Sequence, residues 1–465
     1  MRVDGGALRD CIAKSFLLYY KSVNVPIRYQ IAGEGSNAIA ASIEREIREG
    51  RLPPGARLPT VRALAGQLRR SLGTVAAAYR LLQTRGVIVS DGRRGTIVRP
   101  SPPVFRSIGV LDIPADLINL ANGNPDSELL PRLGTALRTA APKAAVLYGE
   151  PAHDARLLER GAKSFRADGV GHEALAIVGG ALDGIERALC VHLRAGDLVA
   201  VEDPVYPAHL DLLGALGLGH VAVAVDDRGM SPDRLERAVR RGVRALLLSP
   251  RAQNPTGAAL DAKRQAELRE VIAGSEELFV IEDDHAWLVA GVPYRSLTAE
   301  RSRWLVVRSF SKPFGPDLRI AIASGDPATI ARIKGRQQLG VGWVSHLLQS
   351  TAYALWSDPQ ALRAIERARN TYTARRENLL AALANEGIDV RAPSGLNCWI
   401  PVNDEAAALA VLQRAGYALA PGSRFRIETP PAVRATIARL SPRDATHVAA
   451  ALASARKAVT PTRST

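Results

Sequence analysis

Short, continuous apolar runs recur from about residue 117 onward, and longer helical stretches separate them. They occupy residues 198–201, 221–223, 245–248, 279–281, 305–307 and 320–322. Strands that are apolar on both sides, rather than alternating, are typical of a parallel sheet covered by helices on both faces. The pattern predicts an α/β large lobe with a mostly parallel sheet. From about residue 330 the chain is helix-rich, with a strand near residues 398–400, which predicts a smaller α/β lobe.

Polar side chains follow several of these runs, at the strand ends where α/β sheets bind ligands. Lys312 closes the segment Ser309-Phe310-Ser311-Lys312, Asp283 follows the run 279–281, and Arg319 precedes the run 320–322. Alone, a lysine is usually a solvated surface group, and a glycine pair is usually an ordinary turn. Together, an amine, a carboxylate, an amide, hydroxyls, a guanidinium and a glycine-rich turn fit one ligand, pyridoxal phosphate.

Each part of that ligand has candidate partners. Lys312 can take the aldehyde, Asp283 can pair with the ring nitrogen, and Asn254 can donate to the ring oxygen. Tyr206 can lie beside the ring. The phosphate can be held at a helix N-terminus and by hydroxyl and guanidinium groups, for which the candidates are Gly180, Ala181, Ser309, Ser311 and Arg319.

Residues 26–99 have a different pattern. Apolar residues at helical spacing predict three helices, with Thr60 capping the second and Ser71 or Thr74 capping the third, which Gly86 ends. Two short apolar runs around Asp91-Gly92 then predict a β-hairpin. Three helices and a hairpin indicate a winged helix-turn-helix. The candidate DNA-binding residues are Thr60, Arg62, Arg69, Arg70, Ser71, Thr74, Arg93 and Arg94.

Charge supports this interpretation. The whole chain carries a net charge of +15, and residues 26–99 hold thirteen arginines against five acidic residues, a net of +8. A solvated basic face is the plain explanation for such a segment. The arginines at the start of the third helix and at the hairpin tip favour contact with double-stranded DNA instead.

The remaining segments complete the organisation. We expect an N-terminal extension over residues 1–25, a proline-containing linker over 100–116, the large α/β domain over 117–458 and a tail over 459–465. Three widely spaced cysteines, without metal-ligand or redox spacing, predict reduced thiols in a cytoplasmic protein without a metal site. No apolar run has membrane-spanning length, so no membrane partner is expected.

Residues 26–99, which we call the head, resemble the GntR family of bacterial regulators over their whole length. The resemblance rests on motifs within residues 50–65, 74–82 and 95–96, which include Pro59-Thr60-x-Arg62. One departure is Leu72, which follows the serine at the start of the recognition helix, where the family usually has arginine.

Residues from about 117 to 455 resemble fold-type-I aminotransferases. The matching segments are Gly123-Asn124-Pro125-Asp126, Tyr148-Gly149-x-Pro151, Asn254-Pro255-Thr256-Gly257, Glu282-Asp283-Asp284, Ser309-x-Ser311-Lys312, Leu318-Arg319, Pro421-Gly422-Ser423 and Arg434. The resemblance implies that Lys312 binds the cofactor as a Schiff base, that Asp283 contacts the ring nitrogen, and that Arg434, with Gly123 and Tyr148, forms the substrate or effector side. It also implies a homodimer.

The head and the aminotransferase-like domain together resemble MocR-type regulators. A subgroup of these regulators, tied to vitamin B6 salvage, is similar in the segments Asn122-Gly123-Asn124-Pro125-Asp126 and Gly342-Trp343-Val344-Ser345-His346. The substrate side departs from the aminotransferase pattern. His285 replaces the tyrosine that contacts the ring oxygen, and Ala208 stands where some of these regulators carry an effector-binding arginine. His153 and Leu158 replace a common glycine and arginine.

These features predict a transcriptional regulator that senses pyridoxal phosphate, alone or with an amino-acid-like effector. The alternative is an active aminotransferase with an appended DNA-binding head, in which Lys312 would be catalytic. A third possibility, that Ser309-x-x-Lys312 is the acylating motif of a penicillin-binding protein, lacks the S-D-N and K-T-G motifs that such proteins need.

Overall fold

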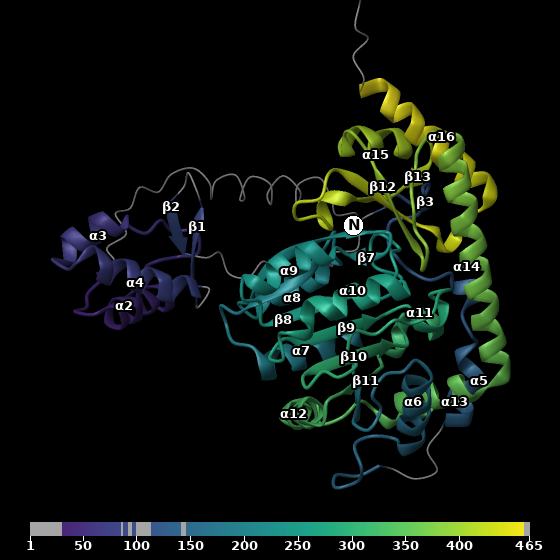
Figure 1. Ribbon diagram of the computed structural model, residues 1–465, viewed down its shortest axis with the longest axis horizontal. Coiled ribbons are helices and arrows are strands. Elements are labelled where there is room, and N and C mark those ends of the chain that lie inside the picture. The colour runs from purple at the N-terminus through teal and green to yellow at the C-terminus, as the bar shows by residue number, and fades with distance from the viewer. Residues whose placement is uncertain (1–29, 85–86, 92–94, 99–112, 141–145, 460–465) are drawn as a thin grey trace, which may run out of the picture. The chain divides into compact units, whose positions relative to one another are not determined.

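The computed structural model describes residues 30–84, 87–91, 95–98, 113–140 and 146–459 (Figure 1). The chain divides into two compact units, Met1–Pro103 and Val104–Thr465. The predicted extension, hairpin tip, end of the third head helix at Gly86 and most of the linker lie outside the described residues. No helix among the described residues is long and apolar enough to span a bilayer.

The first unit is a winged helix-turn-helix. Its helices are α2 (Ser36–Arg48), α3 (Val61–Leu68) and α4 (Leu72–Thr84), and its antiparallel hairpin is β1 (Ile88–Asp91) with β2 (Gly95–Val98). Apolar residues at helical spacing meet in one core, which includes Ile39, Ile43, Leu64, Val75 and Leu82. The predicted fold of the head is therefore confirmed.

Two side chains set the helix starts in this unit. The Thr60 hydroxyl accepts a hydrogen bond from the Ala63 amide at 3.2 Å and begins α3. The Ser71 hydroxyl accepts from the Thr74 amide at 3.0 Å, so Ser71 and not Thr74 caps α4. Arg69 adopts the left-handed conformation, with φ of 52°, and ends α3. This turn separates the two helices of the motif.

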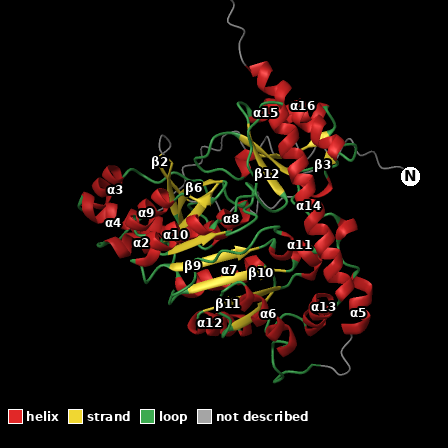
Figure 2. Ribbon diagram, turned by 45° about the vertical axis from the view of Figure 1, so that its right-hand side comes forward, coloured by secondary structure: helices red, strands yellow, loops and turns green. Residues whose placement is uncertain are grey.

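The second unit contains the predicted mostly parallel sheet, which is confirmed. Its eight strands run in the order β4 (Leu175–Val178), β11 (Ala321–Gly325), β10 (Trp304–Ser309), β9 (Phe279–Asp284), β8 (Ala245–Leu248), β5 (Leu198–Asp203), β6 (Gly219–Asp226) and β7 (Gly229–Met230). The five strands from β10 to β6 are parallel, and the pairs at the two ends are antiparallel. Figure 2 shows β9, β10 and β11 side by side.

Helices cover both faces of this sheet. One face packs against α7 (Ala181–His192), α8 (Pro207–Ala215) and α12 (Pro327–Gln338). The other packs against α6 (Ala155–Ala167), α9 (Pro232–Arg240) and α10 (Ala262–Ala273). Because both faces are covered, the strands can be apolar at every position, as the sequence shows.

The smaller lobe lies at the C-terminal end of the chain (Figure 1). It is built from α14 (Pro359–Asn385), α15 (Glu405–Arg414), α16 (Pro442–Val459) and the antiparallel strands β12 (Asn397–Pro401), β15 (Ala432–Thr436) and β14 (Ala420–Pro421). The strand predicted near residues 398–400 is β12. The helix α16 includes Val459, the first residue of the predicted tail, and residues 460–465 lie outside the described part.

A strand from the start of this unit also joins the smaller lobe. β3 (Ile118–Asn119) pairs in parallel with β13 (Tyr417–Ala418). The segment that follows β3 carries Gly123 and leads into α5 (Leu133–Ala140). This pairing places Gly123 beside the C-terminal strands, about 300 residues away in sequence.

Candidate functional site

Lys312 lies in α11 (Ser311–Phe314), which follows β10 directly. Its ammonium group donates a hydrogen bond to the Gly123 carbonyl at 2.6 Å. Phe310 and Phe314 stack with ring centroids 5.0 Å apart and anchor the turn in the core. Burial, and next the nearby Arg434 guanidinium, lower the pKa of Lys312 from 10.5 to about 8. A neutral, nucleophilic amine is therefore accessible near neutral pH.

Asp283 reaches the same region from β9. Side chains alternate along a strand, so Asp283 faces away from Glu282 and Asp284. Its Oδ2 lies 3.3 Å from His209 Nε2 on α8, and both residues are buried. Asp283 Oδ1 is buried without a hydrogen-bond partner among the described residues. A buried carboxylate oxygen without a donor is costly, so this atom is suited to a cationic or N–H group of a ligand.

Arg434 on β15 forms the opposite side of the site. Its Nη1 donates to Asn254 Oδ1 at 3.0 Å, its Nη2 donates to the Ala121 carbonyl, and its guanidinium lies 4.7 Å from the Phe425 ring centroid. Burial lowers the pKa of Arg434 to about 10. It remains cationic at neutral pH and can bind an anion. Since Asn254 uses its oxygen for Arg434, its amide N–H groups can donate elsewhere.

The candidate phosphate cradle surrounds the start of α7. Gly180 precedes Ala181, the first residue of that helix, and has φ of 112°, which favours glycine. A Cβ at Gly180 would lie 2.9 Å from Arg319 Nη2, which shows how closely the guanidinium approaches the turn. Ser309 and Ser311 are joined through their hydroxyls at 3.1 Å. Backbone amides at a helix start, with a nearby guanidinium, form an arrangement that can bind phosphate.

Tyr206 and His285 flank these groups. Burial, and next the charge of Asp283, raise the pKa of Tyr206, whose ring lies 5.4 Å from that of His209. His285 Nε2 forms a 2.8 Å hydrogen bond with the Ala252 carbonyl, and burial lowers its pKa. With Nε2 bound to a carbonyl, only Nδ1 of His285 remains for a ligand.

Tyr148 does not join the buried cluster. Its side chain is 93% exposed and lies edge-on to Trp343, with ring centroids 5.5 Å apart. Gly123, which the sequence resemblance placed with Tyr148 on the substrate or effector side, does contact Lys312. Within one chain, Tyr148 is therefore a surface residue.

Sequence reasoning misses His209, the buried partner of Asp283. Its only signal is its position three residues after Tyr206, at the start of a helix that follows a strand end. A second missed feature is the buried ion cluster on the other face of β9, where Asp284 accepts hydrogen bonds from Arg251 at 2.8 Å and from Arg308 at 3.0 Å. This cluster fixes β9 and thereby the direction in which Asp283 points.

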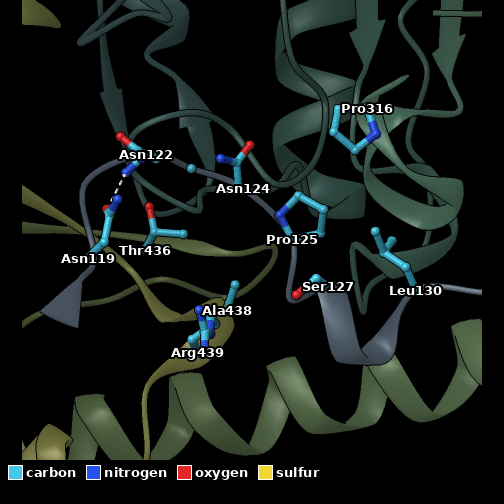
Figure 3. Close-up of a pocket in the computed structure, with 11 residues that line it drawn as sticks. Asn119, Asn122, Asn124, Pro125, Ser127, Leu130, Pro316, Thr436, Ala438 and Arg439 are labelled. Carbon is cyan, nitrogen blue, oxygen red and sulfur yellow. Dashed lines mark hydrogen bonds between the residues drawn. The ribbon is translucent and has the colours of Figure 1, made fainter. Parts of the chain in front are cut away.

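A cavity of about 340 Å³ adjoins the segment that binds Lys312 (Figure 3). Its lining residues are Asn119, Asn122, Gly123, Asn124, Pro125, Ser127, Leu130, Pro316, Thr436, Ala438 and Arg439. The backbone of Gly123 thus contacts both this cavity and Lys312.

In the first unit, the candidate DNA-binding residues lie around the turn between α3 and α4. Arg62, Arg69, Arg70 and Ser71 are exposed, and Thr74 is half-buried. Arg70 Nη2 is 3.2 Å from Glu34 Oε1, a surface pair. Thr60 and Ser71 use their hydroxyls as helix caps. Arg93 and Arg94 lie outside the described residues.

Comparisons with known proteins match both units. Residues 36–98 match the family described as "Bacterial regulatory proteins, gntR family", and residues 115–452 match "Aminotransferase class I and II". Among solved structures, the aspartate aminotransferase from Thermus thermophilus with maleate has a TM-score of 0.65 and 24% identity, covering 73% of this chain and 92% of that chain. This similarity shows the fold of the second unit.

Among curated proteins, the chain is 40% identical to the vitamin B6 salvage pathway transcriptional repressor PtsJ of Salmonella typhimurium, covering 86% of this chain and 93% of that protein. It is 26% identical to the pyridoxine biosynthesis transcriptional regulator PdxR of Corynebacterium glutamicum, covering 72% of this chain and 76% of that protein. The chain therefore belongs to the MocR-type transcriptional regulators of the GntR family, in which a DNA-binding helix-turn-helix precedes an aminotransferase-like domain.

Proposed function

We propose that this regulator binds pyridoxal phosphate in its aminotransferase-like unit and that the bound cofactor alters its binding to DNA. The observation that carries the proposal is the convergence of Lys312 with Asp283, whose Oδ1 is buried and lacks a donor among the described residues. An amine with a lowered pKa and a carboxylate without a donor match the two ends of the cofactor ring.

The other groups around the site fit the rest of that molecule. The start of α7, with Gly180 and Arg319, matches a phosphate, and the free amide of Asn254 matches the ring oxygen. When bound, pyridoxal phosphate supplies an aldehyde that couples to amines and a ring that withdraws electrons. Lys312 would hold the aldehyde covalently, and Asp283 would hold the ring nitrogen in its protonated form.

The relatives suggest what the regulator controls. PtsJ is named for vitamin B6 salvage and PdxR for pyridoxine biosynthesis. We extend this theme to the present chain as part of the proposal: its target genes belong to vitamin B6 or amino-compound metabolism. A sensor of pyridoxal phosphate in the cytoplasm would adjust those genes to the supply of the cofactor.

An amino compound is the second ligand that the site could take. Arg434 is buried and cationic, and its Nε has no hydrogen-bond partner among the described residues. A carboxylate would supply the missing acceptor. The cavity beside Gly123 contacts the same backbone segment as Lys312, so occupancy of either place can affect the other.

Features of the substrate side favour sensing over turnover. Transamination needs a firm grip on the substrate and a ring-oxygen contact that keeps the cofactor reactive. Ala208 is buried and uncharged, and His285 has one ring nitrogen engaged by the Ala252 carbonyl. Two weakened charged contacts, at ~1.5–3 kcal/mol each, would slow turnover strongly and leave a cofactor anchored by its phosphate in place.

A homodimer is also part of the proposal. Large apolar side chains are exposed on neighbouring stretches of the second unit: Leu147 is 66%, Tyr148 93%, Leu339 88% and Val341 71% exposed. Soluble proteins seldom leave such side chains grouped in water. A second copy of the chain would cover them, and a two-fold dimer would match a palindromic or repeated operator.

Covalent capture tests the cofactor assignment. The purified protein is mixed with pyridoxal phosphate, reduced with borohydride and digested, and the modified peptide is identified by mass spectrometry. We expect the label on Lys312. Lys312→Ala should abolish labelling and keep the circular-dichroism spectrum, whereas Lys334→Ala, which alters another partly buried lysine, should label normally. A label on a different lysine would refute the assignment.

An active aminotransferase is the second candidate, and the intact lysine–carboxylate pair favours it. Steady-state assays with a panel of amino donors and keto acids separate the two functions. The sensor predicts turnover far below the enzyme median of about 10 per second, together with a spectral change when the amino compound binds. A turnover number near that median would establish the enzyme.

A further inference from the structure

Leu72 is an unusual residue for its position in the head. Its side chain is 53% exposed, and among the described residues of the first unit it is the one large apolar side chain that is exposed. It is the first residue of α4, the helix that follows the turn of the helix-turn-helix. Exposing a leucine to water at that point offers no stability, because its burial would contribute ~1.5–3 kcal/mol.

The side of α4 next to Leu72 carries Gly73, Ala76, Arg80 and Gln83, which are small or polar. Residues four apart lie on one side of a helix, so Leu72 shares a face with Ala76 and Arg80. Arg80 is exposed and Ala76 is half-buried, whereas Val75 and Leu82 point into the core. A Cβ added at Gly73 would meet only the Ser71 hydroxyl, at 3.7 Å. Leu72 itself is exposed, so its side chain is available to a DNA groove.

The basic residues nearby are placed to contact the DNA backbone. Arg62, Arg69 and Arg70 are long exposed cations around the turn before α4, the place from which such motifs contact phosphates. Phosphate contacts fix the register of the head on DNA and carry no direct sequence information. The first turn of the second helix is the part that reaches base edges in the major groove.

We propose that Leu72 is a specificity-determining residue that contacts the C5-methyl group of a thymine in each operator half-site. The thymine methyl is the apolar feature of the major-groove edge, and apolar side chains recognise it by contact. A leucine there has no hydrogen-bonding group for guanine, so the half-site carries an A·T pair at this position. The inference rests on the proposed DNA-binding function of the head and deepens it.

Removing single methyl groups from the DNA tests this contact. The operator of the full-length protein is first located by footprinting. Each thymine of a half-site is then replaced, one at a time, by deoxyuridine, which lacks only the methyl group. We expect one position at which the replacement weakens binding about fourfold, as for one buried methyl. Replacement of the other thymines should leave the affinity unchanged.

Variants at Leu72 test whether this side chain makes the contact with the thymine methyl group. Leu72→Ala removes the three outer carbons of the side chain, so the ratio of the affinities for the thymine and uracil operators should fall to about one, while the salt dependence of binding is kept. Leu72→Met, which keeps a long apolar side chain, should restore part of that ratio. Gln67→Ala, which alters an exposed residue of α3, should keep the wild-type ratio and serves as the matched control. Because Leu72 is exposed, these changes should not affect folding.

Two results would overturn the inference. One rejects only the role of Leu72, and the other also rejects the DNA-binding function of the head. If the protein protects an operator but Leu72→Ala keeps the wild-type ratio, or no thymine methyl matters, only the role of Leu72 fails. If the protein protects no specific DNA at all, the DNA-binding function fails with it.

Discussion

At the scale of single residues, burial and two charged neighbours set the pKa of Lys312. Burial and the Arg434 guanidinium disfavour the ammonium form, while Asp283 favours it, and the balance places the pKa at about 8. Gly123 holds the amine by its carbonyl, which also favours the proton-bearing form when no ligand is present. The site therefore keeps an amine that loses its proton easily when an aldehyde arrives.

The first prediction concerns pH. Covalent capture needs the neutral amine, so the rate of attachment to cofactor-free protein should rise with pH and level off above about 8. Arg434→Gln removes a positive neighbour, which raises the pKa of Lys312, so the midpoint should move to higher pH. Asp283→Asn removes a negative neighbour and should move the midpoint to lower pH. Stopped-flow absorbance measures both shifts, and unmoved midpoints would contradict the electrostatic account.

The second prediction concerns the carboxylate. Asp283→Asn keeps the shape of the side chain but loses the charge that faces the cofactor ring, which should weaken binding about ten- to a hundredfold, the equivalent of ~1.5–3 kcal/mol. His209→Leu removes the imidazole whose Nε2 lies 3.3 Å from Asp283 Oδ2 and should act in the same direction with a smaller effect. Titration of the absorbance change measures the affinity.

Asp233→Asn, at an exposed position on α9, is the control and should bind as the wild type does. Equal affinity of Asp283→Asn and the control would remove Asp283 from the site.

Sequence reasoning reaches some of these residues and not others, for a physical reason. Asp283 is chosen from the sequence because the segment Glu282-Asp283-Asp284 matches the aminotransferase pattern, and strand alternation then puts Asp283 and Asp284 on opposite faces of β9. Whether a histidine is buried depends on the elements that pack over it, and His209 meets Asp283 only because the start of α8 lies at the end of β9. The surface position of Tyr148 is missed for the same reason, since motif matching carries no information on exposure.

At the scale of elements, the pattern of apolar residues and the helix-capping residues predict most of the strands and helices. The apolar runs become β5, β6, β8, β9, β10 and β11, and Thr60 and Ser71 begin the helices that they were expected to cap. Contacts between distant segments are not encoded in any local pattern. Asp203, at the end of β5, accepts hydrogen bonds at 2.8 Å from the Ile427 and Glu428 amides of the smaller lobe, and β3 pairs with β13.

The third prediction concerns the basic turn of the head. Arg62 is exposed on α3, and if it neutralises one phosphate, Arg62→Ala should flatten the slope of log affinity against log salt by about one unit. Arg241→Ala, which removes an exposed arginine of the second unit, should leave the slope unchanged. Fluorescence anisotropy with operator DNA over a salt series measures both. An affinity that is independent of salt would contradict a phosphate-binding head.

At the scale of the whole molecule, the exposed apolar residues of the second unit predict assembly. Light scattering at micromolar concentration should give the mass of a dimer. Leu339→Asp places a charge within the apolar group and should favour monomers. Leu72→Asp changes an equally apolar, exposed residue of the head and should leave the dimer intact. A monomeric wild-type protein with cofactor bound would refute the homodimer.

At the same scale, we propose that cofactor occupancy at Lys312 changes the affinity of the head for its operator. Such coupling requires that the cofactor bind more tightly to one DNA-binding state than to the other. The most direct measurement is the dissociation constant for operator DNA, determined for the same full-length protein without cofactor, with pyridoxal phosphate, and for Lys312→Ala with pyridoxal phosphate. We expect the cofactor to shift the wild-type constant about five- to 150-fold, and we expect Lys312→Ala to lose most or all of this shift. Identical operator binding with and without cofactor, in protein shown to be labelled at Lys312, would contradict it.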